Sequence, residues 1–274
     1  MKKVVALTLL FFSLFSFQKK EITWVAIGDS ITYLNDHPNE TGNRVTKGYM
    51  TMVTEKLPNI KYVNQGHNGW TAGLIADNIE KIKLTSAEVY TVFLGTNDWW
   101  AGRPIGTLAD YQNNTGSKTL YGSFKIILDK LKSLNKDAKI MLITPLQRGD
   151  FVYLTNFKNN AYGSYKDKKD QQLSQFVDVI IEIGRIENLT VIDLYNKSGI
   201  TLKNMVKFKR LKDPKTGEYK NFTYPDYLDI PFNPDADEYP YPLESVNMTY
   251  DGLHPSDKGN RLICKMLYKE MKKI

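Results

Sequence analysis

Short runs of apolar residues alternate with amphipathic stretches along most of the chain. The first run, ITWVAI at 22–27, is rich in β-branched residues and ends at Gly28. Further runs of strand length follow at 61–64, 89–94, 139–144 and 190–194. Continuous apolar runs bounded by turn residues are typical of strands that are covered on both faces in a parallel sheet. The pattern therefore predicts a five-stranded, mainly parallel sheet.

Between these runs, apolar side chains recur at helical spacing. The clearest case is a face formed by Leu173, Phe176, Val177, Ile180 and Ile181. Helices are predicted over 46–57, 71–83, 119–135, 164–187 and 257–272. Strands that alternate with helices form an α/β domain, here a three-layer doubly wound sandwich. Because ligands bind at the carboxyl ends of the strands in such sandwiches, we expect the functional residues at that edge.

Residues 201–250 depart from this alternation. The turn sequence KDPKTG at 212–217 predicts a β-hairpin, and the stretch after it is rich in tyrosine and proline. We therefore expect a loop and hairpin insertion within one domain that spans 21–274. Both ends of the insertion are expected at the carboxyl edge of the sheet, where it would shape a binding pocket. The alternatives are that it covers the exposed edge of the sheet or forms a dimer contact, and the sequence leaves the oligomeric state open.

The N-terminal segment has the pattern of an export signal. Lys2 and Lys3 precede an apolar run from Val4 to Phe17, and a basic start followed by an apolar core is typical of secretory signals. The sequence thus predicts a signal peptide at 1–20 and export to the periplasm or the extracellular space. No stable membrane span is predicted, because the run is shorter than the ~20 residues of a spanning helix. An uncleaved membrane anchor or a buried first element is the alternative, since no A-x-A cleavage site is present.

Composition changes this picture little. Hydrophobic residues make up 42% of the chain and charged residues 24%, which is ordinary for a globular protein. The net charge of +7 lies partly in patches and indicates a solvated basic face, so no nucleic acid is predicted as a partner. The single cysteine, Cys264, excludes an intrachain disulfide. His37 and His67 lack the spacing of metal ligands, and neither a metal nor another cofactor is predicted.

Short polar motifs follow the predicted strands. They are GDSIT at 28–32, GHNGWT at 66–71 and GTND at 95–98, with DGLHP at 251–255 before the last helix. The chain has three histidines, and one of them, His254, follows Asp251 by three residues in the DGLHP motif. A serine hydroxyl becomes a nucleophile when a histidine takes its proton, and a carboxylate orients that histidine. The pattern therefore predicts a catalytic triad of Ser30, His254 and Asp251.

The four motifs resemble, in order and spacing, the four sequence blocks of the SGNH hydrolase (GDSL-type esterase/lipase) superfamily. The resemblance covers residues 22–272, with GDSI in place of GDSL. It implies a flavodoxin-like sandwich and a serine esterase with Ser30 as its nucleophile. It also implies an oxyanion hole formed by Ser30, Gly69 and Asn97. Gly69 is preferred over Gly66 because it directly precedes the Trp-Thr pair that opens the next helix.

Elementary chemistry is consistent with these roles. A tetrahedral intermediate needs donors for its oxyanion, and the backbone N–H groups of Ser30 and Gly69 with the side-chain amide of Asn97 supply them. Glycine at position 69 lets the backbone approach without a Cβ clash. Asp29 is interpreted as a structural hydrogen-bonding residue, and Asp98 as a cap of the segment that follows it.

The sequence says less about the substrate. Trp70, Trp99 and Trp100 flank the motifs and are predicted to bind substrate at the rim of the site, where exposed aromatic faces suit sugar rings. The absence of a long apolar lid stretch near the site disfavours a lipase. With the export signal, this favours a carboxylic ester hydrolase that removes short acyl groups, acetyl in the first instance, from a small-molecule or glycan ester. The alternatives are a lysophospholipase- or thioesterase-type lipid esterase and a non-catalytic glycan-binding relative.

Overall fold

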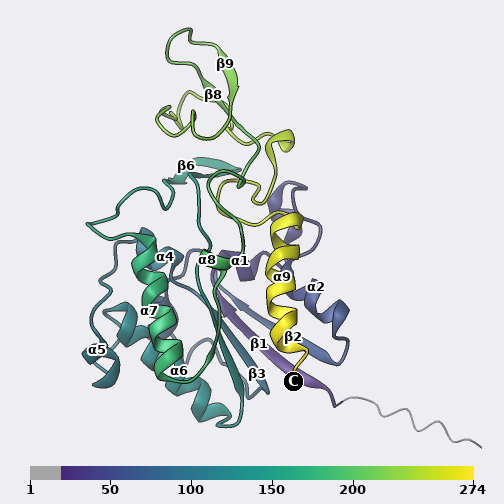
Figure 1. The fold of residues 1–274 in the computed structure, drawn as a ribbon, viewed down its shortest axis with the longest axis vertical. Helices are drawn as coiled ribbons and strands as arrows, with labels where there is room; N and C mark the ends of the chain where they lie inside the picture. Colours follow the sequence, from purple (N-terminus) through teal and green to yellow (C-terminus); the bar gives the residue numbers. More distant parts are fainter. Residues whose placement is uncertain (1–19) are drawn as a thin grey trace, which may run out of the picture.

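The computed structural model describes residues 20–274, so the predicted signal segment at 1–20 lies outside the described residues except for Lys20. A central sheet of five parallel strands runs through this part of the chain (Figure 1). Its strand order, β2-β1-β3-β4-β7, is that of a flavodoxin-like doubly wound sheet. The predicted fold class is confirmed, and this sheet is parallel throughout. Its strands are β1 (Ile22–Gly28), β2 (Ile60–Gly66), β3 (Val89–Phe93), β4 (Lys139–Ile143) and β7 (Thr190–Ile192).

Helices cover both faces of the sheet (Figure 1). On one face, α3 (Ala72–Asp77), α6 (Leu120–Leu134) and α7 (Leu173–Ile186) contribute to one large buried apolar cluster. On the other face, α2 (Tyr49–Lys56) and α9 (Asp257–Met271) contribute to the second cluster. Each helix therefore stabilises the fold by burying its apolar face against the sheet.

Strand β1 lies inside the sheet, between β2 and β3. Successive side chains of a strand point to opposite faces, and accordingly Val25 joins the cluster under α3, α6 and α7, whereas Trp24 joins the cluster under α2 and α9. The register pairs Gly28 with Gly66 on β2 and with Phe93 on β3. The GDSIT and GHNGWT motifs therefore begin at the same level, at the carboxyl edge.

Short elements complete the edge of the sheet. α1 and α4 begin directly after β1 and β3, which places the residues at their starts at the carboxyl ends of those strands. The short elements are α1 (Ser30–Tyr33), α4 (Thr96–Trp100), α5 (Leu108–Gln112), α8 (Leu194–Lys197) and 3-10 turns at Pro38–Thr41 and Leu243–Ser245.

Within residues 20–274, none of the helices combines the length and the apolar character that a membrane crossing requires.

The helix predicted at 164–187 is wrong in its first part. Lys169 and Asp170 have φ angles of 49° and 59°, which a right-handed helix does not contain. The helix begins only at Leu173, where the side chains of Gln172 and Gln175 form a capping box. Similarly, the helix predicted at 71–83 ends at Asp77.

Two antiparallel hairpins lie outside the central sheet. The first, β5 (Phe151–Tyr153) and β6 (Asn156–Ala161), was not expected from the sequence. The second, β8 (Lys209–Lys212) and β9 (Tyr219–Phe222), has the KDPKTG sequence at its turn. In Figure 1 the second hairpin lies farthest from the sheet, beyond β6.

The insertion packs on the β5–β6 hairpin. A separate buried cluster joins Val152 of β5 to four side chains of the insertion, which are Val206, Leu211, Tyr227 and Tyr241. Lys209 of β8 forms a buried ion pair with Asp150, Nζ to Oδ2 2.5 Å, just before β5. The two hairpins therefore form one unit on the carboxyl side of the sheet.

Candidate active site

Ser30 lies at the turn where β1 leads into α1. Asp29 is the N-cap of this helix, and its Oδ1 accepts a hydrogen bond from the backbone N–H of Ile31 at 3.0 Å. Ile31 and Thr32 are buried, whereas Ser30 is only half-buried. The GDSIT motif thus presents a serine hydroxyl at the carboxyl edge, and Asp29 has the structural role that the sequence indicated.

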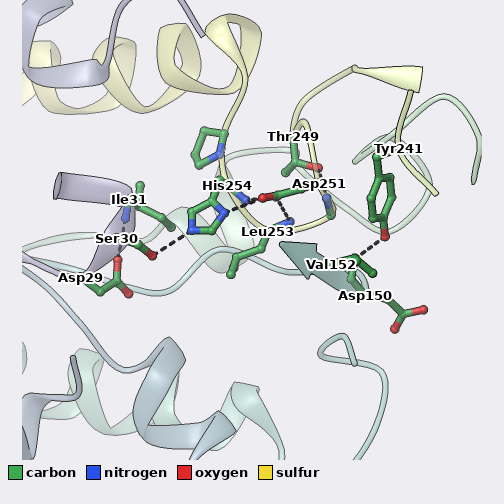
Figure 2. A network of polar contacts seen from close by, with 12 residues as sticks. Asp29, Ser30, Ile31, Asp150, Val152, Tyr241, Thr249, Asp251, Leu253 and His254 are labelled. Atoms are coloured by element: carbon green, nitrogen blue, oxygen red, sulfur yellow. Dashed lines mark hydrogen bonds and ion pairs between the residues drawn. The ribbon is translucent and has the colours of Figure 1, made fainter. Parts of the chain in front are cut away.

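His254 connects Ser30 to Asp251, as Figure 2 shows. The Nε2 atom of His254 lies 2.9 Å from Ser30 Oγ, and its Nδ1 atom lies 2.7 Å from Asp251 Oδ2. The other carboxylate oxygen of Asp251 accepts the backbone N–H groups of Leu253 at 3.0 Å and of His254 at 2.7 Å. When Nδ1 carries the proton toward the carboxylate, Nε2 is free to accept the serine proton. The three residues that the sequence predicted as a triad are therefore linked in one chain of contacts, with His254 in the middle.

The imidazole ring of His254 is held between two aromatic rings. Phe151 contacts it edge-on, with ring centroids 5.3 Å apart and an interplanar angle of 77°. Tyr250 stacks on it at 5.7 Å and 18°. His254 is only 6% exposed, so packing as well as hydrogen bonding restricts its orientation.

Gly69 and Asn97 lie on the same pocket as Ser30. Gly69 has a φ of 73°, which favours glycine, and it is exposed at the surface. Asn97 is half-buried at the start of α4, and its Nδ2 donates to the backbone carbonyl of Trp70 at 3.0 Å. The structure thus places both predicted oxyanion residues beside the serine.

Asp98 connects the GTND motif to the GHNGWT motif. Its Oδ2 accepts the backbone N–H of Ala72, the first residue of α3, at 2.9 Å. Its Oδ1 lies 3.7 Å from Arg103 Nε. The expectation that Asp98 caps the segment following it is therefore wrong, because the carboxylate is bound to the start of a different helix. Together, Asn97 and Asp98 hold the loop that carries Gly69.

A pocket of about 440 Å³ opens in front of the serine. Its lining is both polar and apolar. Ser30, Gly69, Asn97 and His254 lie on it together with the polar side chains of Glu40, Asn68 and Asn159. Aromatic and aliphatic side chains also line it, namely those of Leu34, Trp100, Phe151, Tyr153, Tyr250 and Leu253.

The three tryptophans predicted at the rim differ in position. Trp100 lines the pocket and is half-buried. Trp99 is only 1% exposed, and its indole nitrogen donates to the carbonyl of Gln171 at 3.1 Å, so its predicted place at the rim is wrong. Trp70 stacks on His67 with centroids 4.3 Å apart and packs against the main core. Trp70 is not among the residues that line the pocket in the described part of the chain.

The β5–β6 hairpin supplies a wall of the pocket that sequence reasoning missed. Phe151, Tyr153, Asn159 and Ala161 of this hairpin face the cavity. Only the alternation of Phe151 and Tyr153 signals a strand, and the following stretch contains several asparagines, which disfavour strands. Side chains of the insertion pack on this hairpin in a separate buried cluster.

Buried charges surround the triad. Burial raises the pKa of the Asp29 carboxyl to about 6, and it raises the pKa of Asp98 to about 6 as well. Arg148 is buried on the pocket wall, and burial lowers its pKa to about 10. Its guanidinium carbon lies 5.6 Å from the ring centroids of both Trp99 and Trp100. These groups set the electrostatic environment of the serine and the histidine.

The two other histidines have local partners. His37 stacks on Tyr33 at 3.8 Å, and its Nδ1 lies 2.9 Å from the backbone carbonyl of the same residue. His67 stacks on Trp70 as described above. Among residues 20–274, no group of three or more His, Cys, Asp or Glu side chains is placed to hold a metal ion.

Comparisons with known proteins agree with this geometry. The family model for the GDSL-like lipase/acylhydrolase family matches residues 26–262. A solved structure from Chitinophaga pinensis, described as a possible lipase, is 60% identical, covers 92% of this chain and 98% of its own, and superposes with a TM-score of 0.91. A search of curated proteins gives no match.

Two more distant structures share the fold. A lipase/acylhydrolase from Enterococcus faecalis is 20% identical, with coverages of 92% and 96% and a TM-score of 0.51. A mutant of an acetyl-xylooligosaccharide esterase from Geobacillus is 18% identical, with coverages of 92% and 94% and a TM-score of 0.53.

The fold and the family match define an ester hydrolase of the SGNH superfamily. The chain belongs to the GDSL-like lipase/acylhydrolase family, as its four motifs indicated.

Proposed function

We propose that this ester hydrolase removes short acyl groups, chiefly acetyl, from a carbohydrate, with Ser30 as nucleophile, His254 as general base and Asp251 as its orienting carboxylate. The observation that carries this proposal is the continuous set of contacts from Asp251 through His254 to Ser30, which ends at the pocket. A purely glycan-binding relative has no need of this relay.

Acylation follows from the positions of these atoms. Ser30 Oγ attacks the carbonyl carbon of the ester while its proton passes to His254 Nε2, 2.9 Å away. The imidazolium that forms is stabilised by Asp251 Oδ2, 2.7 Å from Nδ1. When the carbon–oxygen bond to the leaving alcohol breaks, His254 returns the proton to that oxygen. The products of this half-reaction are a free alcohol and an acyl group on Ser30.

The oxyanion of the tetrahedral intermediate lies beside Ser30, Gly69 and Asn97 in this proposal. The backbone N–H groups of Ser30 and Gly69 and the Nδ2 group of Asn97 are its donors. Because one N–H of the Asn97 amide binds Trp70 O, its second N–H is the one available to the oxyanion. A pre-oriented donor of this kind contributes about 10²- to 10³-fold to turnover.

Deacylation reverses the roles. A water molecule gives a proton to His254 Nε2 and attacks the acyl carbon, and the same donors stabilise the second oxyanion. When the acyl–oxygen bond breaks, His254 returns the proton to Ser30 Oγ. The carboxylic acid leaves and the enzyme is restored.

The pocket lining supports a carbohydrate as the alcohol part of the ester. Aromatic faces such as those of Trp100 and Tyr153 suit the apolar faces of sugar rings, and Glu40, Asn68 and Asn159 offer hydrogen-bonding groups for hydroxyls. We further propose that the 1–20 segment directs export, which brings the enzyme to glycans outside the cytoplasm. A lipid ester is the competing substrate, since the 60% identical structure is described as a possible lipase.

An activity assay on two classes of ester tests the substrate class. Acetate release is measured on acetylated xylan, acetylated pectin and acetylated mannan, and fatty-acid release on lysophosphatidylcholine and long-chain acyl-CoA, with Ser30→Ala as the control for each. We expect one acetylated glycan to give the highest kcat/KM, with no release by Ser30→Ala. Higher kcat/KM on the lipid substrates would replace the carbohydrate proposal with the lipid one. Unchanged release by Ser30→Ala would refute the serine mechanism.

A further inference from the structure

Except for its last residue, Tyr250, the insertion at 201–250 reaches the triad without lining the pocket. Of the residues described at 201–249, none is among those that line the cavity in front of Ser30. The insertion nevertheless leads directly into Tyr250 and Asp251. The insertion therefore contacts the catalytic residues through side chains that do not line the pocket.

Tyr241 is the residue of the insertion that makes this contact. Its side chain is fully buried. Its hydroxyl donates to the backbone carbonyl of Asp150, as Figure 2 shows. Its own backbone carbonyl accepts a hydrogen bond from Arg44 Nη2 at 3.1 Å. Tyr241 thus binds the loop after β4 through Asp150. It also binds, through Arg44, the loop that follows the 3-10 helix at Pro38–Thr41.

The same hydroxyl lies against Gly252, between the two catalytic residues of the last motif. A Cβ added to Gly252 would lie 2.9 Å from the Tyr241 hydroxyl and 2.0 Å from the Asp150 carbonyl oxygen. Gly252 has a φ of 85°, which favours glycine in any case. The Asp251–His254 turn is therefore in close contact with the Tyr241–Asp150 pair and has no space to move toward it.

Hydrogen bonds fix the turn from its other sides. The carbonyl of Gly252 accepts the backbone N–H of Gly149 at 2.7 Å. The N–H of Gly252 donates to Thr249 Oγ1 at 3.2 Å, and Thr249 in turn donates through its backbone N–H and its hydroxyl to the carbonyl of Met205. Both ends of the insertion, near Met205 and near Tyr241, thus support the same turn.

Lys209 stabilises the position of Tyr241. Its Nζ pairs with Asp150 Oδ2 at 2.5 Å and lies 4.5 Å from the ring centroid of Tyr227 and 5.8 Å from that of Tyr241. Since Asp150 carries both the ion pair and the carbonyl that Tyr241 binds, displacement of the hairpin would move the Tyr241 contact as well.

We propose that Tyr241 is a positioning residue for the reaction, and that the insertion acts on turnover by holding the Asp251–His254 turn in line with Ser30. This inference rests on the catalytic roles proposed above. It differs from a role in shaping the pocket, because it predicts an effect on kcat and not on substrate choice. A small displacement of a catalytic group, of about 1 Å, is enough to lower a rate by up to about 10²-fold.

The test compares Tyr241→Phe with Tyr239→Phe. The Tyr239 hydroxyl also donates from the insertion to the first hairpin, to Val152 O at 3.2 Å, but does not lie against Gly252. With p-nitrophenyl acetate, we expect Tyr241→Phe to lower kcat about tenfold while KM stays near the wild-type value. Active-site titration corrects for any inactive protein. Tyr239→Phe should keep kcat within about twofold.

Two further measurements separate positioning from simple stabilisation. In Tyr241→Phe the acid limb of the kcat/KM profile should move to lower pH, because a looser Asp251 contact stabilises the imidazolium less. The downfield NMR resonance of the His254 Nδ1 proton should shift or broaden in this variant and not in Tyr239→Phe. Loss of thermal stability with kcat per titrated site, pH profile and resonance unchanged would overturn the proposal.

If Tyr241→Phe does not accumulate as folded protein, Arg44→Met takes its place, because it removes the donor to the Tyr241 carbonyl. The same readouts and the same outcomes then apply. Ser30→Ala, assayed in parallel, separates this inference from the proposed function. An active Ser30→Ala would refute the catalytic roles themselves, whereas an inactive Ser30→Ala with wild-type kinetics in Tyr241→Phe and Arg44→Met would refute only the role of Tyr241.

Discussion

Asn97 donates a hydrogen bond from its side-chain amide to the backbone carbonyl of Trp70, with Nδ2 and the carbonyl oxygen 3.0 Å apart. Trp70 directly follows Gly69, so one N–H of this amide orients the loop that carries a proposed oxyanion donor, and the other N–H is itself a proposed donor. In the proposed mechanism Asn97 therefore has two functions at the same site.

Replacement of Asn97 by alanine should therefore affect the transition state more than substrate binding. We expect Asn97→Ala to lower kcat about 10²- to 10³-fold, with a much smaller change in KM, as measured with p-nitrophenyl acetate. Asn159→Ala removes an exposed amide from the same pocket and is the matched control, for which a change in KM alone is expected. A raised KM with unchanged kcat in Asn97→Ala would show that this residue only holds substrate.

The triad residues should act as one unit. Ser30→Ala and His254→Ala are each expected to lower kcat by about 10⁴-fold or more, and the double variant should be little worse than either single variant. Circular dichroism and thermal unfolding provide the check that the fold is intact. Additive losses in the double variant would mean that the two side chains contribute independently, which contradicts the relay geometry.

The buried carboxyl of Asp29 should make stability depend on pH. Because its pKa is raised to about 6, the folded protein holds a proton that the unfolded chain has lost between about pH 4 and pH 6. The free energy of unfolding should therefore fall as pH rises through this window. Asp29→Asn keeps an acceptor for Ile31 N–H. In this variant the change in the free energy of unfolding across the window should be smaller by about 1 to 3 kcal/mol, as measured by urea unfolding at a series of pH values.

Asp36→Asn is a control, for which the change in the pH dependence of stability should have the opposite sign. Burial raises the pKa of Asp36, but hydrogen bonds from Tyr62 and Asn64 outweigh it and lower the pKa overall. The stability that Asp36 contributes is therefore present at neutral pH and is lost as pH falls below the value of the unfolded chain. If both variants changed the pH dependence in the same direction, the assignment of Asp29 would be wrong.

Trp99 and Trp100 should respond differently to truncation. Trp100→Ala removes an aromatic wall of the pocket, and we expect a higher KM for a glycan ester with a normal melting temperature. Trp99→Ala removes a buried core side chain, and the free energy of unfolding should fall by about 3 to 5 kcal/mol. Kinetics on an acetylated oligosaccharide together with urea unfolding measure both effects. A stable Trp99→Ala with impaired substrate binding would reverse the two assignments.

The sequence was sufficient for the parts of the molecule in which local pattern and tertiary structure agree. The strands of the central sheet are buried on both faces and therefore appear as continuous apolar runs, of which ITWVAI at 22–27 is the clearest. Ser30, His254 and Asp251 were identifiable because the chemistry requires these residue types and because the chain has few histidines. The contact between Ser30 and His254 depends on the folded structure, because Asp251 and His254 lie between the insertion and α9 and not at the end of a strand of the central sheet.

Other features depend on contacts that no local pattern contains. Sequence alone does not show that Trp99 is buried and Trp100 only half-buried, since the two residues are adjacent in a short helix. The β5–β6 hairpin is stabilised by the insertion, some fifty residues later in the chain, so its own sequence carries only a weak strand signal. The role of Asp98 depends on the position of Ala72, which only the folded structure provides.

The hydrogen bond between Ser30 and His254 joins residues 224 positions apart. During synthesis Ser30, the proposed nucleophile, therefore emerges from the ribosome long before His254, the proposed base, which is made only with the segment before the final helix. Until that helix has docked beside α2, the growing chain has a serine but no means of activating it. On the proposed mechanism, ester cleavage therefore requires completion of the fold, and a nascent or prematurely terminated chain that lacks His254 is expected to be inactive.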